Sequence, residues 1–200
     1  MPLLQSPALV GRRVLLEPLR EEHVDALVAA AAEDRGSYRW TTVPDAPEAM
    51  SRYVAELLAG RDAGEVVPFV QRDAGSGRPL GCTRFLHLRF LPGAALPYAV
   101  EVGGTWLAAS AQRTGLNREA KLLLLGHAFE HWGVARVELR TDARNERSRT
   151  AIAAIGAAFE GVLRCAQPSA AAGEQGLLRD TAVFSVLAAE WPGVRDRLAC

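Results

Sequence analysis

The sequence lacks an excess of charge of either sign. Its 200 residues include 23 Lys and Arg and 23 Asp and Glu, so the formal net charge is zero at pH 7. No long run of one sign occurs, whereas a general nucleic-acid-binding protein needs a basic surface. We therefore expect no nucleic-acid partner.

Long hydrophobic runs and paired cysteines are also missing. No stretch approaches the roughly 18 apolar residues that cross a bilayer, and residues 1–7 lack the basic segment and apolar core of a secretion signal. Cys82, Cys165 and Cys200 are odd in number and widely spaced, which favours free thiols over disulfides or a zinc site. The sequence predicts a cytoplasmic protein with no membrane partner and no metal.

What is present is an ordinary globular composition, with 49% hydrophobic and 23% charged residues. A chain of this length buries roughly 70% of its unfolded surface, so one domain can form a full core. No repeat or linker divides it. We predict a single domain over residues 1–200, with a core over 13–187 and a helical tail over 188–200.

The pattern of apolar residues predicts a mixed α/β (α+β) fold. The predicted strands are residues 13–19, 66–72, 80–88, 98–107, 136–141, 158–164 and 181–187. The predicted helices are residues 21–34, 48–58, 121–132, 145–155 and a tail interrupted near Pro192-Gly193, and residues 167–176 are predicted to be a loop. The unit from 98 to 141 should cross over right-handed, which makes its two strands parallel.

A glycine-bearing turn leads from the strand at 98–107 into the following helix. Gly115 can adopt a positive φ or let a ligand approach the backbone, and backbone N–H groups at a helix start favour phosphate. The turn also offers side-chain donors from Arg113, Thr114, Asn117 and Arg118. It lacks the lysine motif of a P-loop and the Gly-x-Gly-x-x-Gly of dinucleotide folds. It is therefore another kind of phosphate site or a plain connector.

Three linked motifs lie in and around this turn. They are Gln112-x-x-Gly115-x-Asn117 with Arg118-Glu119-Ala120, the preceding Glu101-Val102-Gly103, and the later Asn145-Glu146-Arg147-Ser148 with the stretch 155–164. Together they resemble the GNAT superfamily of N-acetyltransferases, and within it the RimJ/RimL-type branch, the ribosomal-protein N-acetyltransferases and their relatives. The departure is Asn117, where that family prefers glycine or alanine.

The resemblance implies a mostly antiparallel GNAT-like sheet flanked by helices, with one parallel strand pair splayed at the acetyl-CoA site. It implies transfer of acetyl from acetyl-CoA, used as co-substrate, to a primary amine by direct attack. The residues expected to contact the cofactor are Trp106, Leu107, Gln112, Arg113, Thr114, Gly115, Leu116, Asn117, Arg118, Asn145 and Ser148.

Direct attack needs a base for the amine and an acid for the leaving thiolate. Glu101 is the expected base, because it is a carboxylate on a mostly apolar strand beside Gly103-Gly104. Many GNAT enzymes use a tyrosine after the next strand as the acid, but all three tyrosines of this chain precede the motif. The resemblance places Ser148 near the sulfur instead, whereas Asn145 is typical of a helix cap.

The acceptor is the open part of this interpretation. It could be a protein N-terminus or a small amine, with Tyr38 and Trp40 as candidate substrate contacts. Trp106 could line the amine pocket or belong to the core. One alternative is a CoA-binding sensor without catalysis; another is an antibiotic-modifying enzyme, which predicts an acidic cleft. The last strand and the C-terminal helix could support a homodimer, although no motif demands one.

A second motif competes with this interpretation. His127-Ala128-Phe129-Glu130-His131 matches the His-x-x-Glu-His pattern of some zinc proteases. However, the apolar residues of the same helix should form its buried stripe and leave both histidines on its flank. We therefore expect no zinc site.

Overall fold

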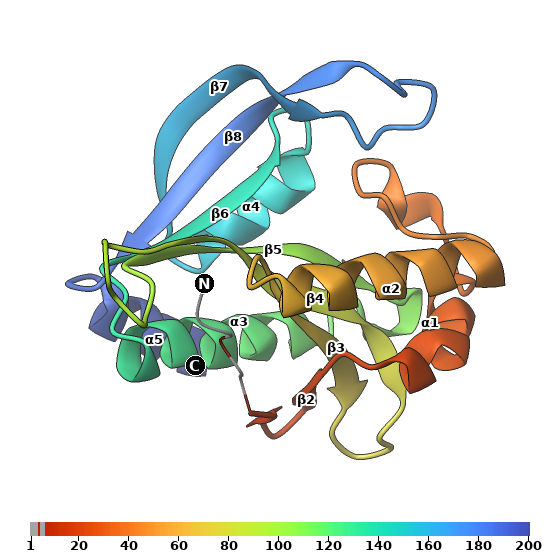
Figure 1. The fold of residues 1–200 in the computed structure, drawn as a ribbon, viewed down its shortest axis with the longest axis horizontal. Coiled ribbons are helices and arrows are strands. Elements are labelled where there is room, and N and C mark those ends of the chain that lie inside the picture. The colour runs from red at the N-terminus through yellow and green to blue at the C-terminus, as the bar shows by residue number, and fades with distance from the viewer. Residues whose placement is uncertain (1–3, 5–6) are drawn as a thin grey trace.

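The computed structural model describes residue 4 and residues 7–200, which form a single eight-stranded sheet in the order β1-β2-β3-β4-β5-β6-β8-β7 (Figure 1). The strands are β1 (Leu9–Val10), β2 (Val14–Pro18), β3 (Val67–Asp73), β4 (Pro79–Arg89), β5 (Ala99–Leu107), β6 (Arg136–Asp142), β7 (Ala158–Pro168) and β8 (Leu178–Leu187). All neighbours are antiparallel except β5 and β6. The predicted mixed sheet with one parallel pair is confirmed.

Helices cover both faces of this sheet. They are α1 (Val24–Ala31), α2 (Pro47–Asp62), α3 (Leu116–Gly126), α4 (Glu146–Ala154) and α5 (Trp191–Ala199). In β4, Arg84 contacts Tyr53 of α2, whereas the next residue, Phe85, packs on Trp132 just beyond α3. Because successive strand residues face opposite sides, α2 and α3 lie on opposite faces.

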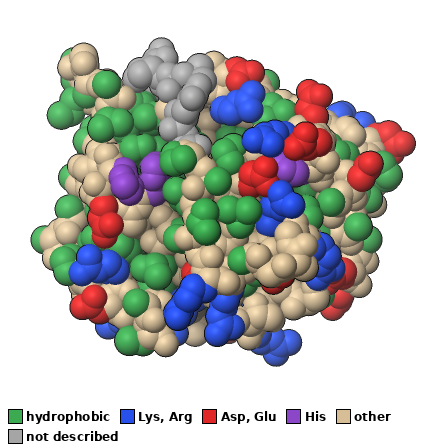
Figure 2. Space-filling view, turned by 90° about the horizontal axis from the view of Figure 1, so that it is seen from below, with side chains coloured by type: hydrophobic (Ala, Val, Ile, Leu, Met, Phe, Trp, Pro, Cys, Tyr) green, Lys and Arg blue, Asp and Glu red, His purple; other side chains and the backbone are tan. Residues whose placement is uncertain are grey.

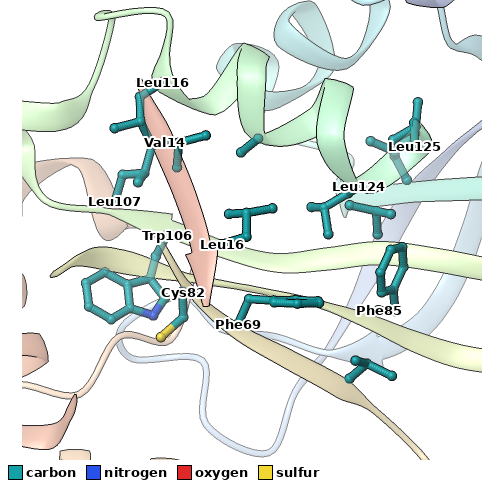
Figure 3. Packing of buried hydrophobic residues seen from close by; sticks show 14 of the residues in the cluster. Val14, Leu16, Phe69, Cys82, Phe85, Trp106, Leu107, Leu116, Leu124 and Leu125 are labelled. Carbon is teal, nitrogen blue, oxygen red and sulfur yellow. The ribbon is translucent and has the colours of Figure 1, made fainter. Parts of the chain in front are cut away.

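The core between the sheet and α3 comes from the apolar side of that helix. Leu116, Leu124 and Leu125 are buried at helical spacing. In Figure 3, Leu124 and Leu125 lie over Phe69 and Phe85, and Leu116 lies beside Val14 and Leu107. Figure 3 also shows Trp106 and Cys82 on the far side of the sheet from α3. Residues of β4 and β5 therefore alternate between a face covered by α3 and a face covered by α2.

The first turn of α3 differs most from the sequence prediction. The helix begins at Leu116 rather than at residue 121. The Glu119 carboxylate accepts hydrogen bonds from the backbone N–H groups of Arg12, Arg13 and Val14 at 3.0, 2.7 and 3.0 Å. This anchor to the start of β2 is a long-range contact, so local propensity did not reveal it.

Several other helices and strands also have boundaries that differ from the predicted ones. The C-terminal helix α5 is continuous, because Pro192 lies in its first turn, where its missing N–H costs nothing. The loop predicted at 167–176 is shorter at its start, since β7 extends to Pro168. β8, the last strand in the chain, is paired on both sides, so β7 forms this edge of the sheet and β1 the other. The strand β1 was not predicted.

The surface shows no segregation of charge on the face seen from below in Figure 1. Acidic and basic side chains are spread there among apolar and neutral ones (Figure 2). Among the described residues, no helix is both long enough and apolar enough to cross a membrane.

Glu119→Ala should destabilise the fold. Three backbone N–H groups would lose a charged acceptor, and hydrogen bonds to charged groups contribute about 1.5–3 kcal/mol each in net terms. Because water can replace part of this, we expect a loss of about 2 kcal/mol in the free energy of unfolding, measured by urea titration. The control is Glu56→Ala, an exposed change in the middle of α2. Equal stability of the two variants would refute the anchor.

Candidate active site

The centre of the candidate site is an opening between the parallel strands. β5 and β6 pair only at Ala99–Arg136, Val100–Val137 and Glu101–Glu138. Both strands then continue without pairing to each other, β5 to Leu107 beside β4 and β6 to Asp142 beside β8. The predicted parallel pair therefore separates just before Gly103-Gly104.

Two glycines shape the β5 side of this opening. Gly104 has a φ of 57°, and a Cβ on it would lie 2.4 Å from Cζ of Arg84. A Cβ on Gly103 would lie 2.9 Å from Oε1 of Glu101. A side chain at either position would displace the end of the Arg84 or Glu101 side chain, and the positive φ of residue 104 favours glycine. The strand also has an irregular register between Arg84 and Cys82 of β4.

The backbone of β5 presents polar groups to the opening. The carbonyl of Trp106 accepts from Gln71 Nε2 at 3.3 Å, so it faces away from β6. By alternation, the N–H groups of Thr105 and Leu107 face the unpaired edge. The Leu107 carbonyl at this edge accepts from the Tyr38 hydroxyl at 2.9 Å and from Gln112 Nε2 at 3.0 Å.

The glycine turn lies at the wide end of the opening. Gly115, with a φ of 86°, immediately precedes α3, and Arg113 also has a positive φ, of 61°. Thr114 Oγ1 donates to the Ala111 carbonyl at 2.7 Å, so this hydroxyl stabilises the turn. The free N–H groups at the start of α3 give this end of the opening a positive potential.

Gln112 is a brace between three segments. Its Nε2 donates to Ser37 Oγ at 2.8 Å in addition to Leu107, and its Oε1 accepts from Arg147 Nη2 at 3.1 Å. The side chain thus connects the end of β5 to the loop after α1 and to α4. The side chain at the first position of the motif therefore holds these segments together, and only the backbone of Gln112 is left to contact a cofactor.

Asn117 and Arg118 point to different surroundings. Oδ1 of Asn117 is buried and has no hydrogen-bond partner among the described residues. The Arg118 guanidinium donates to the carbonyl of Arg197 in α5. Asn117 therefore keeps an unused acceptor next to the turn, whereas Arg118 ties α3 to α5.

Asn145 and Ser148 form the cap of α4. The Asn145 Oδ1 accepts from the backbone N–H of Ser148 at 3.1 Å. This is the arrangement expected of an N-cap residue and its third helical position. The Ser148 side chain is half-buried.

Glu101 is the buried carboxylate at the point where the strands separate. It is 5% exposed, and its Oε2 lies within hydrogen-bond distance of His87 Nδ1, at 2.8 Å, and 3.3 Å from Arg140 Nε. His87 is half-exposed and has a φ of 50°, at an irregular position of β4. Nothing in the sequence marked His87, because it reaches Glu101 only through the pairing of β4 with β5.

Glu138, the partner of Glu101 across the last strand pair, is surrounded by arginines. Arg89, Arg136 and Arg140 donate to its carboxylate at 2.6, 2.9 and 2.7 Å. Burial alone would raise the pKa of Glu138, but these hydrogen bonds outweigh it and hold the pKa at about 2. The group therefore stays ionised and fixes the strands where they separate.

Tyr38 and Trp40 occupy unlike positions. Tyr38 is buried, packs edge-on against the core residue Trp106, and uses its hydroxyl on Leu107. Trp40 is half-buried, with the Arg144 guanidinium 4.4 Å from its ring centroid. Arg144 also pairs with Asp142 and with Glu174 in the β7–β8 loop, at 2.8 Å each. Trp40 thus belongs to a contact between two loops.

The zinc-protease pattern is used for packing. His127 is buried against Phe85 and Trp132, so the prediction that it lies on the helix flank is wrong; a π-helical turn over His127–His131 rotates it inward. Glu130 accepts from the Trp191 indole at 2.8 Å. Burial, and to a lesser degree the neighbouring His131, lowers the pKa of His127 to about 4.

His127→Leu should make stability less dependent on pH. Below pH 6.5 the unfolded chain binds a proton at this histidine, whereas the folded protein does so only near pH 4. The folded state therefore loses stability as the pH falls from about 6.5 to about 4. We expect the variant to lose less stability than the parent between pH 7 and pH 5, measured by urea midpoints. His131→Leu, at an exposed site, should keep most of the dependence; an identical effect of both variants would contradict this assignment.

The arrangement of a splayed parallel pair, a glycine turn and a following helix is that of acetyltransferases that bind CoA. The family model described as an acetyltransferase (GNAT) domain matches residues 13–158. None of the curated proteins compared with the chain matches it significantly. The chain belongs to the GNAT family of acetyltransferases.

Solved structures agree with this assignment. A GCN5-related N-acetyltransferase from Brucella melitensis superposes with a TM-score of 0.84 at 26% identity, over 99% of this chain and 86% of that one. A T. thermophilus protein described as an acetyltransferase gives 0.80 at 33% identity, over 98% and 97%. RimJ from Mycobacterium smegmatis, in complex with CoA-disulfide, gives 0.76 at 24%, over 93% and 88%, and is similar in fold.

The family defines the chemistry. The protein is an acyltransferase that uses acetyl-CoA as co-substrate, as the sequence predicted. This outcome favours catalysis over the alternative of a CoA-binding sensor.

Proposed function

We propose that the acceptor is a primary amine that enters the opening on the face away from α3, where Glu101 takes up its proton. The observation that carries this proposal is the position of Glu101, buried at the last strand pair and connected to a half-exposed histidine. Leu86, its partner in β4, follows Phe85, which faces α3, so Glu101 faces the other side.

Each reacting group then has a route. The amine nitrogen attacks the thioester carbon, the C–S bond breaks with its electrons on sulfur, and Glu101 receives the amine proton, which His87 can pass to solvent. The thioester oxygen would meet the N–H groups of Thr105 and Leu107 at the unpaired edge of β5. Arg140 and His87 keep the carboxylate in one orientation.

The geometry of the glycine turn indicates where acetyl-CoA would bind. The pyrophosphate would lie at the start of α3, against the backbone of residues 113–116, with Arg118 nearby and Asn117 offering its unpartnered oxygen. Leu107 would contribute backbone contacts at the unpaired edge, whereas the Trp106 carbonyl faces β4 and its side chain is buried, so Trp106 would only support the site. Ser148 and Asn145, at the start of α4, would lie on the thiol side.

For the acceptor class we favour a protein N-terminus over a polycationic antibiotic. The carboxylates around the opening, Glu101, Glu138, Asp142 and Glu174, each lie beside an arginine. Such pairing leaves little free negative charge for a polycation. Relatives in fold include a ribosomal-protein-S5-alanine acetyltransferase from Vibrio fischeri and RimL, described as acetylating L7/L12. Buried Cys82 and exposed Cys165 and Cys200, all free, support a reducing compartment such as the cytoplasm.

The acceptor class is tested with a panel read by thiol release from acetyl-CoA. It contains short peptides with free N-termini, the same peptides blocked at the N-terminus, small monoamines and an aminoglycoside. We expect turnover with free N-terminal peptides and none with blocked ones. Turnover restricted to the aminoglycoside would exclude the proposed acceptor, and turnover restricted to monoamines would replace it with a small amine.

Glu101→Gln should lower kcat by about 10²- to 10⁴-fold, because it removes the proton acceptor and keeps the shape. Acetyl-CoA affinity, measured by calorimetry, should change by less than about two-fold, since the carboxylate lies away from the pyrophosphate end. The matched control is Glu160→Gln, which alters a carboxylate that pairs with Arg136 and Ser185 outside the opening. Unchanged kcat in Glu101→Gln would eliminate this residue as the base.

A further inference from the structure

Lys121 is a buried amine on the sheet-facing side of α3. It is 8% exposed, although its neighbours on this side, such as Leu124 and Leu125, are apolar. Its Nζ donates to Thr105 Oγ1 at 2.9 Å, and that hydroxyl shares a hydrogen bond of 2.8 Å with Thr83. No ion pair of Lys121 is found within the part of the chain that the structure describes.

Burying an ammonium group against hydroxyls alone is unfavourable, so packing does not explain this lysine. A Met or Leu at residue 121 would continue the apolar stripe of α3. The polar positions that do lie on this side of the helix are Asn117 and Lys121, four residues apart and therefore on one face. Asn117 lies next to the glycine turn, and Lys121, one helical turn further on, contacts Thr105 beside the opening.

The position of Lys121 is opposite that of Glu101. Trp106 faces away from α3 (Figure 3), so its neighbour Thr105 faces α3 and meets Lys121 there. Glu101 faces the other side, together with His87. A carboxylate and an amine thus flank the unpaired strand edge from the two faces of the sheet.

We propose that Lys121 is the acid that protonates the CoA thiolate as it leaves. When the acceptor nitrogen displaces sulfur from the acetyl carbon, the electrons of the C–S bond remain on sulfur. The Lys121 ammonium transfers one proton to that sulfur, which gives CoA thiol and a neutral amine. Solvent entering after product release returns the proton to Lys121. The inference rests on the proposed entry of the acceptor from the Glu101 side.

The acid–base properties of Lys121 suit this task. Burial lowers its pKa to about 8, and Glu101 on β5 opposes the shift. β4 contributes the Thr83 hydroxyl, and α3 itself contributes Asn117, neither of which titrates in this range. An alkyl thiol such as cysteine has a pKa of about 8.5, so the transfer is nearly balanced. The hydroxyl of Ser148 is a much weaker acid than an ammonium group, so proton transfer from it to the thiolate would be far less favourable.

The direct test needs no acceptor. CoA is bound to the protein, and its thiolate is followed by ultraviolet absorbance as a function of pH. An ammonium group beside the sulfur should lower the thiol pKa, so bound CoA should ionise at lower pH than free CoA. In Lys121→Met this shift should disappear, with at least about a ten-fold smaller ratio of thiolate to thiol at the same pH.

Two controls separate charge from structure. Methionine matches the length of the lysine chain and suits an apolar site, so Lys121→Met should fold and bind desulfo-CoA with unchanged affinity. Thr83→Val alters the same buried hydroxyl pair but leaves the hydrogen bond between Lys121 and Thr105, so it should retain the lowered thiol pKa. If Thr83→Val abolishes the shift as Lys121→Met does, the shift follows the packing around β5 and not the ammonium, and the proposal is wrong.

Turnover gives the second readout. Lys121→Met should reduce kcat by about 10- to 100-fold with little change in KM for acetyl-CoA, and the pH–rate profile should lose its decline near pH 8. Glu101→Gln leaves the Lys121 side chain in place, so bound CoA should still have a thiol pKa below that of free CoA. Failure of the base assignment is thereby distinguishable from failure of Lys121. Identical CoA titrations in the parent protein and Lys121→Met would overturn the inference.

Discussion

The structure depends most on the charge cluster at the point where β5 and β6 separate. Glu138 ends the last strand pair and holds arginines from β4 and β6, two of them on its own strand. A buried carboxylate with three guanidinium donors has few alternative arrangements, because each donor comes from a different position of β4 or β6 and all three must reach the same two oxygens. The cluster therefore fixes the strands up to this pair. Beyond this pair, the course of β5 is set by Gly103 and Gly104 and by the hydrogen bond from Gln112 to the Leu107 carbonyl.

Different contacts hold the two ends of the opening between β5 and β6. At its narrow end, ionic contacts hold β5 and β6 together. At its wide end, Gln112 and Tyr38 bind the Leu107 carbonyl and hold β5 from the side of the α1 loop. Glu119 meanwhile fixes the first turn of α3 to β2. Each contact joins segments distant in sequence, so the cofactor site is an outcome of the whole fold.

Much of the fold could be predicted from the sequence, but less of the site. Apolar periodicity and the glycine turn predicted the parallel pair, because crossover handedness follows from local order. The side-chain partners could not be predicted in this way. Tyr38 and Leu107 are 69 residues apart, and only the folded chain reveals that this tyrosine is a core residue. His87 and Lys121 were missed for the same reason: a histidine in a hairpin and a lysine in a helix are ordinary until the sheet brings them to one opening.

The contact of Trp40 with Arg144 has a consequence for how molecules reach the opening. Arg144 stacks on a ring from the α1–α2 loop and pairs with an acidic residue of the β7–β8 loop, so these loops meet through one side chain. The Arg144 side chain is about half-exposed, and added salt weakens such ion pairs while leaving the stacking less affected. The spacing of the two loops should therefore respond to ionic strength. An acceptor peptide with a carboxylate would compete with Glu174 for Arg144. The contact between the two loops would therefore favour or disfavour acceptors by their charge before acetyl transfer begins.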